Sequence, residues 1–351
     1  MQALDLAVIP LDAARRTTLR LATRSTLLTR VLSRRDSRIA CLAAVQVAVL
    51  FGLSLRVPVA LFFLGPVVFG VAHLAADVRY LVLRRAPPRA LVVASAAFAF
   101  AITAARVAVG TRAVSMRAGD RIDVLFGVAW IGFAVTLALR DRLRIAFAVA
   151  PVLVGVAWLV VARAHVVNLA LVHVHNLVAV FAWLLLFRRR RGWATLPLAL
   201  VAAGAAVLLS GATLPWALAH GGLSAFGMPS ARLAAWIAPG VHGELALSLT
   251  TSFVFLQGVH YAAWTAWIPQ DDLRTQGTPT FRMSVRALQR DFGPVVFGVI
   301  VLAALAFAAL AIWNVRESVV WYMTLVKSHA WFELSFLAYL VLRRERRNQA
   351  S

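Results

Sequence analysis

The sequence predicts an all-α protein, a polytopic membrane bundle of about ten transmembrane helices. Three observations lead to this prediction: the composition, the length of the apolar stretches and the distribution of the arginines. Of the 351 residues, 62% are apolar or aromatic and 14% are charged, whereas a soluble domain has about 45–50% apolar and ~25% charged residues. A single soluble core stops growing at about 250–300 residues. The surplus of apolar side chains is therefore expected to face lipid, which argues against a soluble enzyme.

The chain divides into a basic segment, residues 1–38, a single membrane domain, residues 39–342, and a basic tail, residues 343–351. In the first segment Arg16, Arg20 and Arg24 recur at helical spacing, which indicates an amphipathic helix on the anionic inner leaflet. A solvated basic tail is the alternative. The membrane domain contains apolar stretches long enough to cross a bilayer as helices. They are residues 39–55, 58–83, 89–109, 122–139, 144–162, 165–187, 194–214, 236–267, 294–314 and 318–342.

The loop arginines give the orientation of these spans, because short cytoplasmic loops are enriched in Lys and Arg. The chain has 36 basic and 14 acidic residues, a net charge of +22, and every basic residue except Lys327 is arginine. With the first segment inside, alternate loops are arginine-rich. These inside arginines are Arg84, Arg85 and Arg89; Arg140, Arg142 and Arg144; Arg188 to Arg191; Arg274, Arg282, Arg286 and Arg290; and Arg343, Arg344, Arg346 and Arg347.

The other loops contain fewer arginines, and the alternation holds through the whole chain. The outside arginines are Arg56, Arg112, Arg117, Arg121, Arg163, Arg232 and Arg316. The pattern predicts an integral protein of a bacterial-type inner membrane with both termini in the cytoplasm. Because the arginines lie between hydrophobic stretches and not in a polar domain, no nucleic-acid partner is expected. The oligomeric state is left open.

Seven of the eight histidines lie in or beside a predicted span, and each of those spans is even-numbered. An ionisable side chain inside a membrane is expensive and indicates a functional site. Four histidines each lie 11 to 14 residues before the first cytoplasmic arginine that follows their own span. The difference of three residues corresponds to about 4.5 Å in depth along parallel helices. These histidines are His73, His175, His260 and His329. Since imidazole is a common ligand of iron, copper and zinc, these four are predicted to share one metal ion.

Two of these histidines have a carboxylate four residues later, on the same helical face: Asp77 follows His73, and Glu333 follows His329. Metal-bound histidine usually donates its other ring N–H to a carboxylate or a carbonyl. Asp77 and Glu333 are therefore predicted as candidate catalytic residues that act through the ligands. The alternative is a salt bridge from Asp77 to Arg79 or Arg84, and for Glu333 a bond to Lys327 or to a neighbouring helix. The only cysteine, Cys41, excludes a multi-cysteine metal site.

Four segments, GVAHLAADVRYL, VHVHNLVAVF, FLQGVHYAAW and SHAWFEL, resemble the four histidine motifs of the bacterial β-carotene cleavage dioxygenases, the Brp/Blh family, in the same order. The matching residues are Gly70, His73 and Asp77; His175; His260 and Tyr261; and His329 and Glu333. The resemblance implies Fe(II) held by histidines and a dioxygenase-type oxidoreductase that cleaves a carotenoid or another lipophilic polyene. The family has a further histidine four residues before His260, where this chain has Leu256. The resemblance leaves His329 or His173 to take that place.

Three alternatives remain open at this stage. Four histidines in one layer can also ligate haem b in an electron-transfer protein. Intramembrane histidines and carboxylates can relay protons in a proton-coupled transporter. The third alternative is an inactive relative that binds a lipid.

Overall fold

The computed structural model describes residues 8–141, 143–188, 191–220, 224–273 and 279–350, without the side chains of residues 143–150, 152, 153, 191 and 344–350. The outermost residues of the two basic ends therefore lie outside the described part. Several arginines that support the predicted orientation also lie outside the described part, some as whole residues and some only with their side chains. These are Arg142, Arg144, Arg189, Arg190, Arg191, Arg274, Arg344, Arg346 and Arg347.

The described part of the chain is all-α, as predicted, apart from one short antiparallel hairpin of β1 (Ser224–Ala225) and β2 (Met228–Pro229). In its first half the helices are α2 (Ile9–Ala22), α3 (Thr26–Ser33), α4 (Arg35–Arg56), α5 (Pro58–Gly65), η1 (Pro66–Gly70), α6 (Val71–Asp77), η2 (Val78–Leu83), α7 (Arg89–Gly110), α8 (Met116–Leu139) and α9 (Leu143–Ala162).

In its second half they are α10 (Ala164–Val174), η3 (His175–Leu177), α11 (Val178–Ala182), η4 (Trp183–Phe187), η5 (Arg191–Ala194), α12 (Thr195–Leu209), α13 (Leu214–Ala219), α14 (Ser230–Ile237), α15 (Gly243–Ala262), η6 (Ala263–Trp267), α16 (Ile268–Asp271), α17 (Phe281–Leu325) and α18 (His329–Ala350).

Seven helical stretches of the described residues are long and apolar enough to cross a membrane. They are Arg35–Arg56, Pro58–Leu83, Arg89–Gly110, Met116–Leu139, Ala164–Phe187, Gly192–Leu209 and Phe281–Arg343. The long helix α15 is not one of them, because it is rich in polar residues that it buries inside the bundle. Its threonines are examples: Thr250 donates to the carbonyl of Ala246 and Thr251 to that of Ser248.

The outer surface of the long helices is apolar. Ile312 is 89% exposed and Trp313 is 79% exposed, and soluble monomers rarely show a large continuous patch of such side chains. Further exposed apolar residues are Val93, Phe100, Trp158, Val295 and Leu302. This surface is the one expected for helices in contact with lipid.

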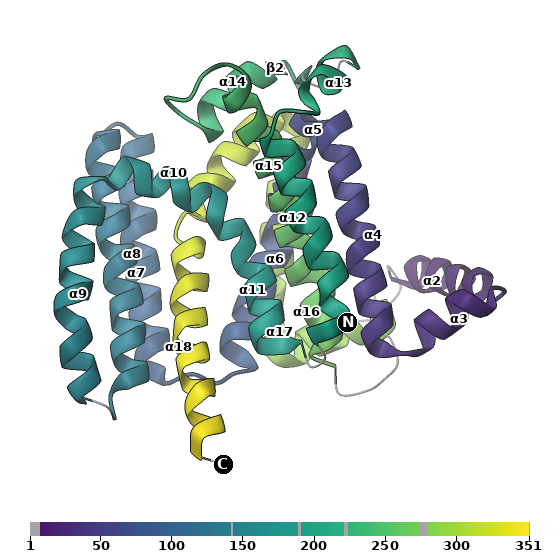
Figure 1. Cartoon of the computed structure of the whole chain (residues 1–351), viewed down its shortest axis with the longest axis horizontal. Helices are drawn as coiled ribbons and strands as arrows, with labels where there is room; N and C mark the ends of the chain where they lie inside the picture. Colours follow the sequence, from purple (N-terminus) through teal and green to yellow (C-terminus); the bar gives the residue numbers. More distant parts are fainter. Residues whose placement is uncertain (1–7, 142, 189–190, 221–223, 274–278, 351) are drawn as a thin grey trace.

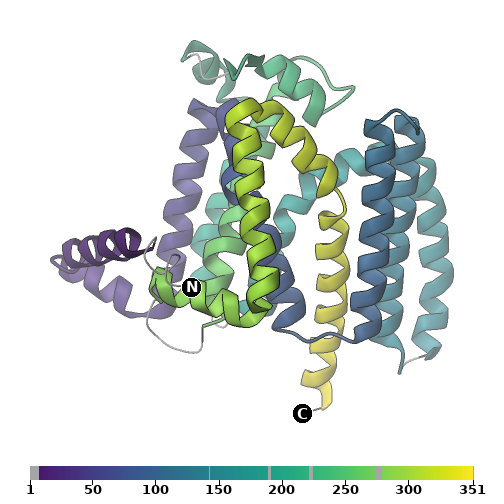
Figure 2. The ribbon, with the colours of Figure 1, turned by 180° about the vertical axis from the view of Figure 1, so that it is seen from behind.

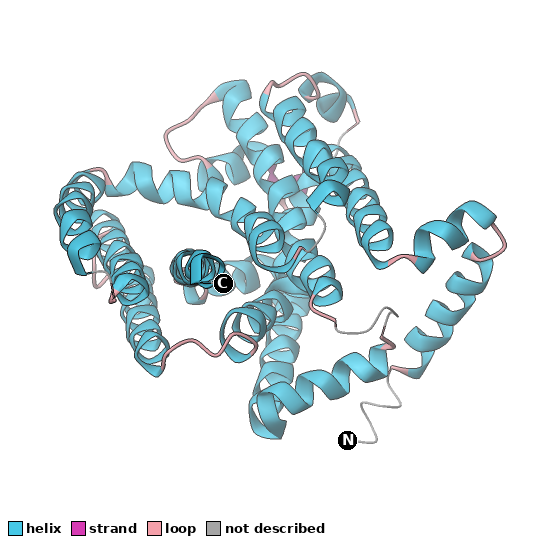
Figure 3. Ribbon diagram, turned by 60° about the horizontal axis from the view of Figure 1, so that its bottom comes forward, coloured by secondary structure: helices cyan, strands magenta, loops and turns pink. Residues whose placement is uncertain are grey.

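The long helices lie side by side, and α13, α14 and the hairpin cover one end of them (Figure 1). Helices α7, α8 and α9 form a layer at one side, and α18 packs against α8 and α7. Seen from the other end, α18 is surrounded by helices (Figure 3). From behind, α17 rises to the covered end, bends and descends towards α18 (Figure 2).

Three predicted spans are broken in the structure. The sixth bends at η3, the eighth begins only at Gly243 after a break that contains Gly240 (φ 82°), and the tenth is interrupted between α17 and α18. Helix α17 itself has non-helical residues at Gly293 and Asn314. The side-chain oxygen of Asn314 accepts hydrogen bonds from the backbone N–H groups of Arg316 and Glu317, so it caps the next helical segment.

Several histidine-bearing helices also contain a π-helical stretch: η1 and η2 flank α6, η4 follows α11, and η6 follows α15. A π segment turns the following side chains relative to a regular α-helix and is frequent at functional sites. The ends of these stretches are anchored by ion pairs. Arg79 binds Asp291 with a nitrogen-to-oxygen distance of 2.7 Å, and Arg188 binds Asp271 at 3.1 Å.

Candidate metal centre

The structure brings together the four histidines that the depth argument selected. His73 lies on α6, His175 is the first residue of η3, His260 lies on α15 and His329 is the first residue of α18. Their ring centroids form a quadrilateral. The neighbouring separations are 5.4 Å for His73 and His260, 5.4 Å for His260 and His175, 5.1 Å for His175 and His329, and 5.3 Å for His329 and His73. His260 and His329 are 6.0 Å apart across it.

This spacing fits one shared ion. Imidazoles that bind an ion at ~2.1 Å from neighbouring positions hold their ring centroids about 4.5–5.5 Å apart. One ring nitrogen each of His73, His260 and His329 lies within 4.8 Å of the others, so these three can hold a metal ion. His175 does not belong to this group of three, although its ring lies beside those of His260 and His329. His73 and His260 are 1% exposed, which removes them from solvent.

Backbone carbonyls orient three of the four rings. The Nδ1 atom of His329 lies 2.7 Å from the carbonyl oxygen of Val326, that of His175 lies 2.9 Å from Leu171, and that of His73 lies 3.3 Å from Phe69. At these distances each Nδ1 carries the proton and donates it, which leaves Nε2 with its lone pair free for a metal. The Nε2 atom of His73 is buried without a hydrogen-bond partner.

The predicted pairing of the carboxylates with the histidines four residues earlier is corrected by these contacts. The carbonyls take that role, because a helical Nδ1 three or four residues after a carbonyl reaches it directly. Instead Glu333 approaches His260, with 3.2 Å between Oε1 and Nε2, and accepts a hydrogen bond of 2.7 Å from the indole N–H of Trp264. The carboxyl of Asp77 lies near that of Glu333, and neither Asp77 oxygen has a hydrogen-bond partner among the described residues. Burial of such a group is costly unless it is neutral.

The salt-bridge alternative for Asp77 is absent from the described residues, whereas the alternative for Glu333, a bond to a neighbouring helix, is present at Trp264. Arg79 and Arg84 both bind Asp291, and Lys327 lies 4.0 Å from Asp123. Asp123 in turn contacts Arg106 and accepts a hydrogen bond of 2.9 Å from the indole of Trp331. This ion cluster holds the start of α18 against α8, and it thereby positions His329.

Two tyrosines that the sequence did not single out for the site lie against His73. The ring centroid of Tyr261 is 4.7 Å from that of His73, and the hydroxyl of Tyr322 lies 3.4 Å from its Nδ1. Gly70 explains how Tyr322 fits, because a Cβ atom at Gly70 would lie 2.5 Å from the Tyr322 ring. The glycine of the first motif was therefore a signal of close approach, although the sequence did not reveal the partner.

A cavity of about 250 Å³, here called the inner cavity, adjoins the centre. His175, His260 and His329 line it, together with Gln257, Tyr261, Tyr322 and Lys327 and several apolar side chains. Neither Asp77 nor Glu333 is among its lining residues. An apolar ligand in this cavity would meet the histidines directly and would not meet the acids.

His173 does not take the place of the histidine that the third motif lacks at position 256. Leu256 is 7% exposed and belongs to the hydrophobic core. His173 lies against Phe253, with 5.7 Å between the ring centroids, away from the four histidines. The rings of His73, His175 and His329 all lie within 6.0 Å of the His260 ring, measured between centroids.

The remaining histidines lie elsewhere. His165 contacts Asp120 at 3.4 Å, His220 stacks on Trp216 with centroids 4.4 Å apart, and His242 is exposed at the start of α15.

Comparison of the chain with protein-family models, with curated proteins and with solved structures gives no match. The fold and the centre therefore define the class of the protein: an all-α protein with membrane-type helices and a buried histidine cluster that can bind a metal ion.

Proposed function

We propose that this protein is an integral membrane oxidoreductase of the dioxygenase type that holds ferrous iron with His73, His175, His260 and His329. Its proposed substrate is a carotenoid or another lipophilic polyene. One observation carries the proposal: ring nitrogens of His73, His260 and His329 lie within 4.8 Å of one another, with the His175 ring beside them, and carbonyls hold three of the four rings. The order of the four histidine motifs supports the choice of iron and of a polyene.

The donor set fits ferrous iron, which imidazole ligands suit and which can activate dioxygen when a coordination position stays open. In this proposal the protein residues bind the ion, orient the histidines and exclude water. Glu333, held by Trp264 and in contact with Asp77, faces His260. Because neither acid lines the inner cavity, both are proposed here as positioning residues that act through the histidines.

The helical directions support the proposed topology of ten spans with both termini in the cytoplasm. Successive long helices run in alternating directions, and the C-terminus lies at the end opposite α13 and α14 (Figure 1). Arg84 and Arg85 directly follow the end of η2 at Leu83. A bacterial-type inner membrane is the location that this arginine bias fits.

Haem b is a less suitable occupant of the same histidines. Four neighbouring pairs of rings have centroids only 5.1 to 5.4 Å apart, and only His260 and His329, at 6.0 Å, approach the spacing of two rings on opposite faces of one haem. Proton-coupled transport has one observation in its favour, the helices interrupted at His175 and before His329, since transporters use broken helices at their binding sites. Metal analysis separates transport from the iron enzyme, and the absorbance of haem in the purified protein separates the haem candidate.

The test is elemental analysis of the full chain purified in detergent, combined with expression in cells that accumulate β-carotene. We expect about one iron per chain and loss of the yellow pigment with formation of an aldehyde cleavage product. His73→Ala should abolish both, whereas His242→Ala, which changes an exposed histidine outside the centre, should leave both unchanged. Absence of iron and of haem from the purified wild type would overturn the proposal in favour of transport.

A further inference from the structure

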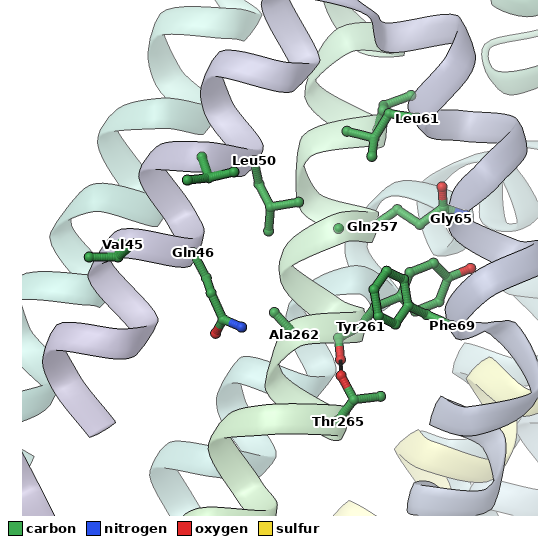
Figure 4. A pocket seen from close by; sticks show the side chains of 13 residues that line it. Val45, Gln46, Leu50, Leu61, Gly65, Phe69, Gln257, Tyr261, Ala262 and Thr265 are labelled. Carbon is green, nitrogen blue, oxygen red and sulfur yellow. Dashed lines mark hydrogen bonds between the residues drawn. The ribbon is translucent and has the colours of Figure 1, made fainter. Parts of the chain in front are cut away.

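A second cavity lies beside the inner cavity and shares two wall residues with it, Gln257 and Tyr261. This outer cavity measures about 220 Å³ and lies between α4, α5 with η1, and α15. Figure 4 shows Gln257, Tyr261 and Phe69 together on one side of it and Gln46 on the opposite helix. The wall is otherwise almost entirely apolar. Its members include Val45, Val49, Leu50, Leu61, Phe69 and Thr265.

Tyr261 is the partition between the outer cavity and the histidines. Its ring lies between that of His73, at a centroid distance of 4.7 Å, and that of Phe69, at 6.2 Å. A Cβ atom at Gly65 would lie 3.2 Å from the Tyr261 ring, so the glycine leaves the ring its space. The Tyr261 hydroxyl bonds to Tyr322 and Gln257. The partition is therefore made of side chains, which can rotate, and not of backbone.

The outer cavity opens towards the apolar outer surface. Val45 and Val49 are each 55% exposed, and Phe69 is 45% exposed. These residues lie on α4 and η1, which are parts of two of the membrane-type helices. A molecule dissolved in the lipid would meet this opening before it could meet the buried histidines.

The sizes of the two cavities indicate what they can hold. Binding sites for small organic ligands usually measure about 300–1,000 Å³. Each cavity alone is below that range, at about 220 and about 250 Å³, but joined across Tyr261 they are within it. The walls of both cavities are mostly apolar, and three of the histidines line the inner one.

We infer that the outer cavity is a second binding compartment of the site. It holds one part of an elongated apolar molecule that enters from the bilayer, passes Gln257 and Tyr261 and presents its other part to the histidine centre. This inference rests on the proposed function for the identity of the reacting end, and it adds the entry route and the residues that limit the length of the ligand.

The test measures retention of β-carotene by the full chain, independently of turnover. The protein is produced in β-carotene-accumulating cells in the His73→Ala background, purified in detergent, and its pigment is extracted and quantified per chain. Val49→Trp fills the outer cavity at its exposed rim, and Leu61→Trp is a second filling variant on another helix. Val93→Trp is the matched control, because Val93 is 69% exposed on α7 and does not line either cavity.

We expect about one pigment per chain in the background and in the Val93→Trp control, and at least about tenfold less in either filling variant. Equal retention in the filling variants and the control, or no retention in the background, overturns the inference. Iron content of the single variant Val49→Trp is measured in parallel and should match the wild type. If the wild type holds iron but the filling variants retain as much pigment as the control, the proposed function stands and the outer compartment is excluded. If the filling variants retain less pigment but the wild type holds no iron, the outer compartment stands and the proposed function is excluded.

Discussion

The residues around His260 differ from those around the other three imidazoles. His73, His175 and His329 each have a backbone carbonyl within 3.3 Å of Nδ1, whereas His260 faces a carboxyl oxygen of Glu333 at 3.2 Å. Glu333 is 0% exposed, and only its contacts with Trp264, His260 and Asp77 compensate for its burial. The ring of His260 also lies beside the backbone carbonyls of His175 and Asn176, so Glu333 is one of several groups around it.

Glu333→Gln is expected to lower the affinity for iron by about 10–100-fold, the usual effect of losing a residue that orients a metal ligand. The amide keeps the shape of the side chain but loses the negative charge beside His260. Iron per chain after dialysis against a weak chelator measures the effect. Ser335→Ala is the control, because Ser335 is equally buried on the same helix and its hydroxyl has no hydrogen-bond partner among the described residues. Equal iron retention in both variants would contradict a role for Glu333.

Gly70→Ala tests the packing between Gly70 and Tyr322. The new methyl group would lie 2.5 Å from the Tyr322 ring, so the variant should lose about 1–3 kcal/mol of stability through overpacking. Gly52→Ala on α4 is the matched control, since a Cβ atom there meets nothing within 4 Å. Ala replaces Gly in a helix with a gain of about 0.5–1 kcal/mol. Thermal unfolding in detergent should show a lower midpoint for Gly70→Ala alone, and equal midpoints would mean that Tyr322 is free to move.

At the scale of the elements, the centre is built where helices are interrupted. His175 begins the short 3-10 turn η3, and His329 begins α18 directly after the break at 326–328. The carbonyl of Val326 at this break accepts from both the backbone N–H and the ring of His329. The break thus places this acceptor beside the His329 ring.

Asn314→Ala should destabilise the segment that leads from the covered end of the bundle down to His329. The side chain of Asn314 accepts from two backbone N–H groups, and the loss of such a cap costs about 0.5–2 kcal/mol. Asn314→Asp keeps the acceptor and should restore most of the lost stability. The unfolding midpoint in detergent checks both variants, and an unchanged midpoint in Asn314→Ala would show that the kink needs no cap.

At the scale of the whole molecule, the prediction concerns topology. Reporter fusions after Arg191 and after Ser351 should both report the cytoplasm, and a reporter inserted after Arg112 should report the opposite side. The reason is the arginine bias between alternate loops. A periplasmic signal at either of the first two positions would break the ten-span scheme, because the four histidines would then come from helices of different direction.

The sequence by itself determined the all-α class, the apolar helices and the depth of the histidines. Hydropathy and loop charge are sums over neighbouring residues, so they need no knowledge of the rest of the fold. That is why the stretches around Leu61, Phe100 and Leu200 could be recognised as helices, and why His73, His175, His260 and His329 could be placed in one layer.

Only the tertiary structure decided which way those histidines face and what surrounds them. The rotation of a helix about its axis depends on contacts between residues far apart in the sequence, such as Gly70 with Tyr322 and Glu333 with Trp264. The spacing of four between His329 and Glu333 correctly put both on one face, but the nearer carbonyl of Val326 took the ring N–H. Glu333 was left to meet His260 from another helix, a contact that no local pattern contains.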